Sequence, residues 1–265
     1  MSDKNETSSA RSAVILAAVL VLLAAFAVEY GLQTLVWISA RHWASANPML
    51  RVAPEPLAIA SPAAAPEPAL STTPAKNTLL KAYEYEFAAP WAGASKLVPG
   101  PAFAQFRFDS GQVIGFFDPE SQLDTMHDIK TANSPEYRQL TDESAGPPID
   151  SDYALYQAVY AASPAQTSPF MHSANAQRLD ELLLLKLQLG QDAQGKLYSF
   201  DFGKNRGLQF GDPASGQPVA LRVFDDSGKQ FRLIFTVAAG SNAKIVQDDI
   251  TTVARSLEPV PLLER

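Results

Sequence analysis

The densest group of side chains that could perform chemistry lies between residues 118 and 128. Asp124, His127 and Asp128 are spaced i, i+3 and i+4, so a helix would place them on one face. Carboxylates and imidazoles are suitable ligands for a divalent cation. Capping is the alternative for Asp118 and Glu120, because acidic residues are favoured at the start of a helix. The candidate metal ligands are Asp118, Asp124, His127 and Asp128.

A glycine-flanked basic segment, residues 203–207, is a candidate anion-binding loop. If it turns tightly, its backbone N–H groups and the side chains of Lys204, Asn205 and Arg206 would converge on one anion. A solvated hairpin turn is the alternative, in which the two cations serve solubility.

Three tyrosines, Tyr153, Tyr156 and Tyr160, recur along one side of a predicted helix, and Phe170 and Met171 follow. Together they could line an apolar pocket or a partner surface. The alternative is that they belong to the core, with hydroxyls that reach water.

One short match to a catalytic motif is present. Ser241 to Lys244 fits the S-x-x-K pattern, and residues 173–175 and 130–132 resemble its companion motifs, but their order along the chain is reversed. With three histidines, no G-x-S-x-G, no P-loop and no H-E-x-x-H, the sequence predicts no catalytic residue. No cofactor is expected either.

The composition excludes several classes of protein. The net charge of −7 comes entirely from the chain after Lys76, where 23 acidic residues face 16 basic ones. An acidic domain without a basic stripe does not favour nucleic-acid binding, which depends on neutralising phosphates. Because cysteine is absent, disulfides, thiolate metal sites and cysteine nucleophiles are excluded.

The N-terminal region predicts a membrane segment. An apolar run, residues 13–28, is extended towards residue 40 by leucines, Val36, Trp37 and Ile38, which together reach the length of a spanning helix. A cleaved signal peptide is the alternative, with Ala25-Phe26-Ala27 as its A-x-A site. Since hydrophobicity resumes past Ala27, we expect an uncleaved, single-pass signal-anchor over residues 13–40.

Residues 41–76 predict a linker rich in proline and alanine. Seven prolines between residues 47 and 76 favour an extended spacer that lifts a domain off a membrane. The basic residues on the two sides of the anchor are equal in number, so the positive-inside rule decides nothing. With only residues 1–12 as a cytoplasmic tail, we expect the globular domain, residues 77–265, on the extracytoplasmic, periplasmic side of a bacterial inner membrane.

Periodicity and turn residues predict the elements of the domain. The alternation at Tyr83, Tyr85 and Phe87 predicts one strand, and Gly111 predicts a hairpin between residues 103–108 and 112–117. Residues 119–130 favour a helix, residues 131–149 a loop, and a further helix opens at Ser151.

The leucine-rich segment, residues 179–189, predicts a core helix, because its leucines cover every side of a helical turn. We expect it on one face of a sheet, covered in turn by the tyrosine helix. The late strands are expected at 196–202, 207–210, 219–224 and 231–237, before a helix from Val246 to Leu257. The predicted fold is α+β: an antiparallel sheet covered by helices, as an α/β/α sandwich.

This order of elements, ending in Ser256-Leu257-Glu258-Pro259, resembles the Mog1/PsbP-type α/β/α sandwich over about residues 79–260. The resemblance implies a binding or assembly module without catalytic residues, and no functional residue is carried over. We therefore expect a membrane-anchored extracytoplasmic binding or protein-interaction module with a possible protein partner. The alternative is an envelope enzyme or ligand-binding protein that uses the acidic cluster near Asp118 or the loop 203–207.

Overall fold

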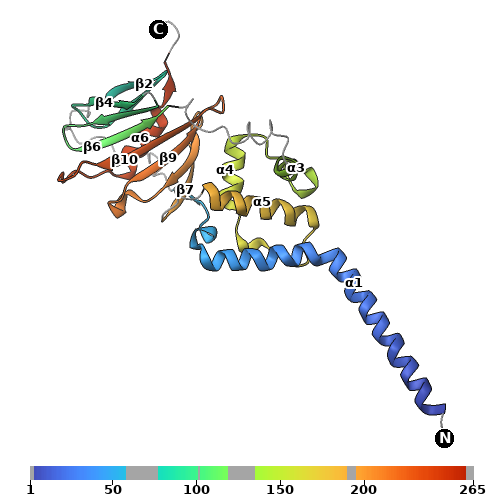
Figure 1. Ribbon diagram of the computed structural model, residues 1–265. Helices are drawn as coiled ribbons and strands as arrows, with labels where there is room; N and C mark the ends of the chain where they lie inside the picture. The colour runs from blue at the N-terminus through green and yellow to red at the C-terminus, as the bar shows by residue number, and fades with distance from the viewer. Residues whose placement is uncertain (1–2, 58–76, 101, 119–134, 190–194, 261–265) are drawn as a thin grey trace, which may run out of the picture.

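Two sheets and a group of helices follow a long N-terminal helix in the computed structural model (Figure 1), which describes residues 3–57, 77–100, 102–118, 135–189 and 195–260. The helices are α1 (Asp3–Ala46), η1 (Pro48–Arg51), α3 (Pro135–Thr141), η3 (Glu143–Ala145), α4 (Asp152–Ala161), η4 (Pro164–Gln166), α5 (Ser173–Leu189), η6 (Pro213–Ser215) and α6 (Gln247–Ser256). The strands are β1 (Glu55–Pro56), β2 (Thr78–Ala82), β3 (Tyr85–Ala89), β4 (Ser95–Gly100), β5 (Phe103–Arg107), β6 (Gln112–Phe117), β7 (Leu197–Asp201), β8 (Arg206–Phe210), β9 (Val219–Phe224), β10 (Gln230–Val237) and β11 (Glu258–Pro259).

The larger sheet has the order β1-β7-β8-β9-β10-β6-β5-β4. Its pairs are antiparallel except β1 with β7, where Glu55 lies opposite Tyr198 in a parallel register. The sheet is therefore mixed, and the prediction of a purely antiparallel sheet is wrong at this edge. Its parallel strand comes from a proline-containing segment whose sequence carries no strand pattern.

The two faces of the large sheet are covered differently. The predicted alternation in β9 and β10 is confirmed, because Leu221 lies opposite Leu233 and both belong to one core cluster together with α6 and β3. Phe224 points to the other face, where it packs with Tyr156 and Tyr160 of α4. The tyrosine helix therefore lies directly on the sheet.

The leucine helix α5 is buried elsewhere than expected. Leu179, Leu182 and Leu183 pack in a cluster with residues of α4 and with Ala40 of α1, so α5 lies mainly against helices. The predicted order of the two helices is wrong: α4 contacts the sheet and α5 lies outside α4. A helix that is apolar all round needs partners on several sides, and here other helices supply most of them.

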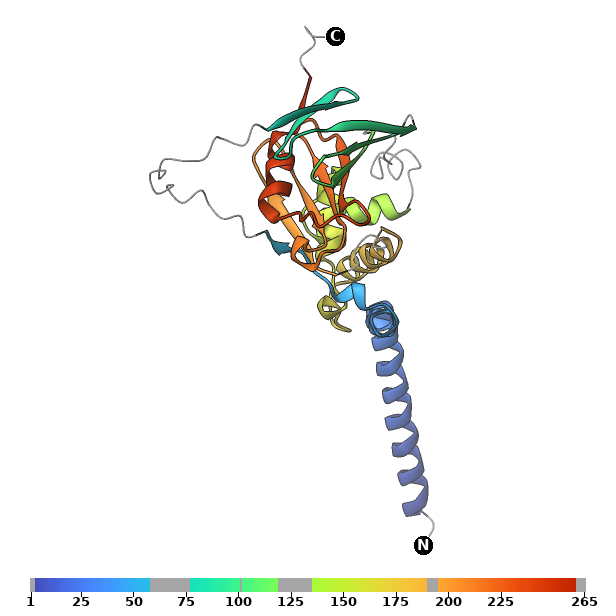
Figure 2. The same ribbon diagram turned by 90° about the vertical axis from the view of Figure 1, so that its left-hand side faces the viewer.

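A second sheet has the order β11-β3-β2 and lies at the end of the domain away from α1 (Figures 1 and 2). The single strand predicted across Tyr83, Tyr85 and Phe87 is wrong, because Tyr83 lies in a turn with a positive φ of 55°. Tyr85 and Phe87 are buried on β3 as the alternation predicts.

The remaining local predictions have mixed outcomes. The hairpin at Gly111 is confirmed, and this glycine has a φ of 99°. Helix α4 begins after Ser151, whose side chain accepts a hydrogen bond from the N–H of Ala154. The loop predicted over 131–149 contains α3 and η3 within its described part. The helix predicted over 119–130 lies outside the described residues.

Helix α1 is bent: its first part projects from the domain and its last part runs along α5 (Figure 1). The helical segment 16–46 is long and apolar enough to cross a membrane. A signal sequence would meet the same two criteria. Of the predicted linker, residues 41–57 form the end of α1, η1 and β1, and they pack on the domain, with Leu50 fully buried. Residues 58–76 lie outside the described part.

The α+β class and one apolar N-terminal helix are thus confirmed. The three-stranded sheet is an addition to the expected architecture, and the finer description as an α/β/α sandwich stays a prediction.

Candidate functional site

The acidic cluster is described only at its first residue. The backbone N–H of Asp118 donates to the carbonyl of Ala102 at 3.0 Å, next to strand β5. Asp124, His127 and Asp128 lie outside the described residues. Among the residues that the structure does describe, no group of three or more His, Asp or Glu lies together in a way that could hold a metal ion.

The loop 203–207 is a tight turn whose polar groups already have partners within the fold. The N–H of Gly203 donates to the carboxylate of Asp201 at 2.8 Å, which occupies the place of an external anion. Asn205 is buried and its amide donates to the carbonyls of Ala254 and Leu257 at 2.9 and 2.8 Å. These are the last carbonyls of α6, so Asn205 caps that helix from a distant turn.

The two cations of this loop point to different elements. Lys204 lies 4.0 Å from Glu258 beside α6, and both side chains are largely exposed. The guanidinium of Arg206 lies over the ring of Tyr153 on α4, 4.3 Å from its centroid. Since α6 and α4 cover opposite faces of the large sheet, Lys204 and Arg206 do not converge on one anion.

A cavity of about 380 Å³ beside Lys204 is lined with charged groups of both signs. The hydroxyl of Tyr85 donates to Asp225 at 3.4 Å, and burial, together with the charge of Asp225, raises the pKa of Tyr85 to about 12. The other carboxylate oxygen of Asp225 accepts hydrogen bonds from the backbone of Ser227 and Lys229. The groups around this cavity thus stabilise the β9–β10 turn.

The tyrosines are part of the core rather than of an open pocket. Tyr156 and Tyr160 are almost fully buried between α4 and the sheet. The Tyr160 hydroxyl donates to the carbonyl of Leu189 at 3.1 Å, and the Tyr156 hydroxyl accepts from Arg222 at 2.9 Å. Tyr153 is half-buried at the edge, and Phe170 is the exposed member of the predicted group.

A cavity of about 480 Å³ lies where β9 begins and β10 ends. Its wall is mainly apolar, and Lys244 stands exposed at its rim. The S-x-x-K pattern of Ser241 and Lys244 gives no sign of the apolar residues that surround them in the fold. No local pattern could reveal this cavity, since segments separated along the chain form it. Its apolar lining includes Pro218, Val219, Phe235, Val237, Ile245 and Val246.

The geometry of Ser241 and Lys244 does not match nucleophilic catalysis. Residues 241–246 form no helix, so a three-residue spacing does not place both side chains on one face. The Ser241 hydroxyl accepts from the N–H of Ala243 at 3.1 Å and lies 3.4 Å from the carbonyl of Ser110. Of the companion motifs, residues 173–175 begin α5, and residues 130–132 lie outside the described part.

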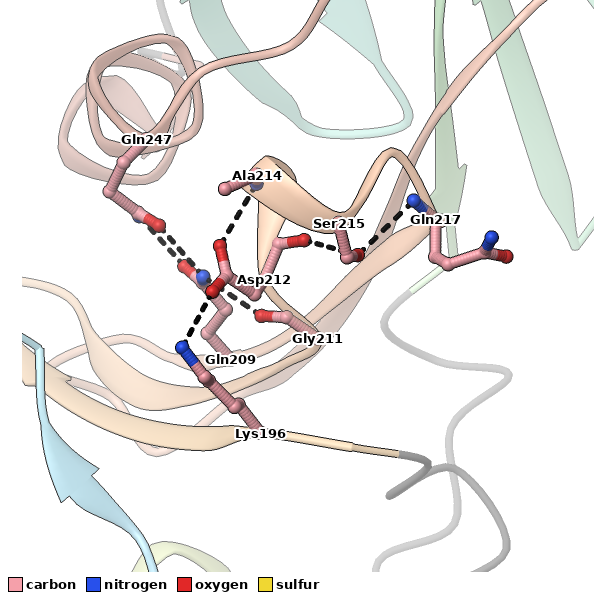
Figure 3. A network of polar contacts seen from close by, with 8 residues as sticks. All are labelled: Lys196, Gln209, Gly211, Asp212, Ala214, Ser215, Gln217 and Gln247. Carbon is pink, nitrogen blue, oxygen red and sulfur yellow. Dashed lines mark hydrogen bonds and ion pairs between the residues drawn. The ribbon is translucent and has the colours of Figure 1, made fainter.

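A polar network holds the η6 side of this cavity in place (Figure 3). Asp212 caps η6 through the N–H of Ala214 at 2.9 Å and pairs with Lys196 at 2.9 Å; these contacts lower the pKa of Asp212. The side-chain amides of Gln209 and Gln247 donate to each other at 2.8 Å and join β8 to α6. The cavity wall is therefore preformed.

A buried lysine was missed by the sequence analysis. Lys186 of α5 is 1% exposed, and its ammonium donates to the carbonyls of Val52, Tyr160 and Ala162 at 2.6, 2.8 and 2.7 Å. Burial lowers the pKa of Lys186 to about 8. The available signal was a lysine inside a run of leucines that must be packed on most sides.

Comparison of the chain with models of protein families, with curated proteins and with solved structures found no match.

Proposed function

We propose that this chain is a non-enzymatic, membrane-anchored binding module, in which α1 crosses a bilayer once and holds the domain on its extracytoplasmic side. The observation that carries the proposal is the two-part character of α1. Within its apolar first part, residues 16–23 are exposed, as a lipid-facing helix requires. Its second part is buried on one side by α5, which ties the anchor to the domain.

The domain is proposed to lie at the outer face of a bacterial inner membrane. The domain follows the apolar run along the chain, so all of it lies on one side of the membrane in this proposal. A reporter fused after Arg265 that is active only outside the cytoplasm is the expected result. Activity of that fusion only in the cytoplasm would reverse the topology without removing the anchor.

The binding role rests on the 480 Å³ cavity. An apolar wall with one exposed ammonium at its rim suits an apolar side chain of a partner next to a carboxylate. The binding role agrees with the resemblance to the Mog1/PsbP-type fold, because proteins of that fold are mostly binding and assembly modules. That resemblance itself stays a prediction.

Site-specific photo-crosslinking in native membranes tests the binding role. A benzophenone amino acid replaces Val246 at the cavity or, as the control, Leu79 on β2; both positions are exposed. We expect one discrete adduct from position 246, none from position 79, and loss of the adduct when Lys244→Glu is added. Equal labelling from both positions, or an adduct insensitive to Lys244→Glu, would remove the cavity from the proposal.

A further inference from the structure

The outer face of the second part of α1 is apolar although the domain covers the inner face. Gln33, Val36 and Ala40 are buried against the domain. On the opposite side Leu35 is 63% exposed and Ile38 is 52% exposed. Exposure of this apolar face to water is energetically unfavourable. The face therefore indicates a nonaqueous neighbour.

The segment between η4 and α5 contacts α1 just before its second part. The ring of Phe170, in the segment between η4 and α5, lies 6.5 Å from the ring of Phe26 and 6.0 Å from that of Tyr30. Phe170 is nevertheless 70% exposed. Its free surface adjoins the lipid-facing part of α1, and the two form one continuous apolar surface.

The helix length fixes the depth of these contacts. A spanning helix needs about 20 residues at about 1.5 Å each, so a span that starts at Ala13 ends near Leu32. For an untilted helix, Tyr30 and Phe26 then lie about 3 and 9 Å inside that boundary. Because Phe170 contacts both rings, any bilayer that surrounds them also surrounds Phe170.

The next residues have the character of an interfacial segment. The guanidinium of Arg41 lies 4.5 Å from the centre of the Trp37 ring. Tryptophan is favoured at the headgroup level, where an arginine can keep its charge in water while its stem covers apolar surface. The outer face of α1 then becomes polar at His42 and Ser45.

We propose that the domain sits directly on the bilayer, with Phe170 and the outer face of α1 around Leu35 and Ile38 inserted at the boundary between acyl chains and headgroups. The partner is a phospholipid surface. This inference rests on the proposed anchoring by α1, and it goes further, because a proline-rich spacer alone would hold the domain away from the membrane.

The absence of cysteine from the chain permits a clean test with the full protein. In four variants a single cysteine replaces Phe170, Leu35, Val21 or Leu79 and carries a spin label. Each labelled protein is reconstituted in vesicles of phosphatidylcholine and phosphatidylglycerol. Collision with oxygen, which enters the bilayer, is compared with collision with a water-soluble nickel chelate. Val21 reports on the span, and Leu79, which is 59% exposed on β2, is the matched apolar control.

We expect the ratio of oxygen to nickel collisions to be high at Val21, Leu35 and Phe170 and low at Leu79. A high ratio at Val21 with values at Leu35 and Phe170 equal to that at Leu79 would overturn the inference and leave the anchor intact. A low ratio at Val21 would instead overturn the anchor. Dipolar broadening between labels on Phe170→Cys would show that a second copy covers this face, which also overturns the inference.

Discussion

At the scale of single residues, Lys186 connects three parts of the helical layer. The carbonyls of Tyr160 and Ala162 lie at the end of α4, where a helix leaves its last carbonyls without an internal partner. A cation near these carbonyls is favourable. Its third acceptor, Val52, follows α1 and η1. One ammonium group on α5 therefore holds together α4 and the segment that follows α1.

Replacement of this lysine should be costly. Lys186→Met keeps most of the apolar stem but leaves three buried carbonyls without a donor, and removal of a buried charge offsets part of the loss. We expect the free energy of unfolding to fall by about 2–4 kcal/mol in denaturant titrations. The control Lys204→Met, at an exposed site, should change it by less than about 0.5 kcal/mol. Equal effects of the two variants would contradict this role.

The same residue predicts a pH dependence. The pKa of Lys186 is about 8 in the folded state, against an ordinary value of 10.5. Between these values the unfolded chain binds more protons than the folded one, so this group makes the folded state more stable as the pH rises through that window. The difference in unfolding free energy between wild type and Lys186→Met should therefore grow by at most about 3 kcal/mol from pH 8 to 10.5. A constant difference would show that the three carbonyls hold the pKa of Lys186 near its ordinary value, and a shrinking difference would show that they raise it.

At the scale of elements, the close approach of β8 to β9 depends on a missing side chain. A Cβ at Gly207 would lie 2.0 Å from the carbonyl oxygen of Arg222, which is backbone of the neighbouring strand. At Gly115 of β6 a Cβ would instead meet the ring of Phe103 at 2.7 Å, which can rotate aside. The two glycines thus differ in how much of the sheet must move to accept a methyl group.

Alanine substitutions at the two positions test this difference. Gly207→Ala should lower the free energy of unfolding by more than about 3 kcal/mol, because the strands can separate only by losing their pairing. Gly115→Ala should lower it by roughly 1–2 kcal/mol. Thermal melting of both variants gives the comparison, and a larger loss at Gly115 would mean that the β8–β9 pairing adapts more easily than the backbone contact indicates.

For the molecule as a whole, the two parts of α1 differ in their surroundings. A helix of 44 residues is about 66 Å long, roughly twice the hydrocarbon thickness of a bilayer, so a bilayer could hold only part of it. The contacts with α5 and η4 show where its second part goes. The domain and α1 are therefore one assembly, in which Phe170 of the domain contacts Phe26 and Tyr30 of α1.

This arrangement predicts that the chain keeps its N-terminal segment. Cleavage after Ala27 would remove Phe26, one of the two rings against Phe170, together with the apolar run. Intact-mass analysis of the protein purified from membranes should show residues 13–27 retained. A mass that corresponds to a chain beginning at Val28 would identify a signal peptide, and it would leave only residues 28–46 of α1 on the domain.

Elements that depend on local rules could be predicted from the sequence alone. Glycine at position 111, the serine cap before α4 and the alternation in β9 and β10 act between near neighbours, so the hairpin, the helix and the buried face of the strands were predicted correctly. The leucine run predicted α5 for the same reason. The apolar N-terminal run likewise predicted one helix of membrane-spanning length.

The positions of these elements and of the candidate side chains depend on packing between distant segments. Asn205 bonds to carbonyls about fifty residues further along, β1 pairs with a strand far from it in sequence, and Lys186 is buried by three segments at once. No residue pattern encodes such distant partners, because each contact depends on how the other elements pack. For the same reason the sequence could name Tyr153, Tyr156 and Tyr160 as one stripe, but only packing placed Tyr156 and Tyr160 in the core and left Phe170 exposed beside α1.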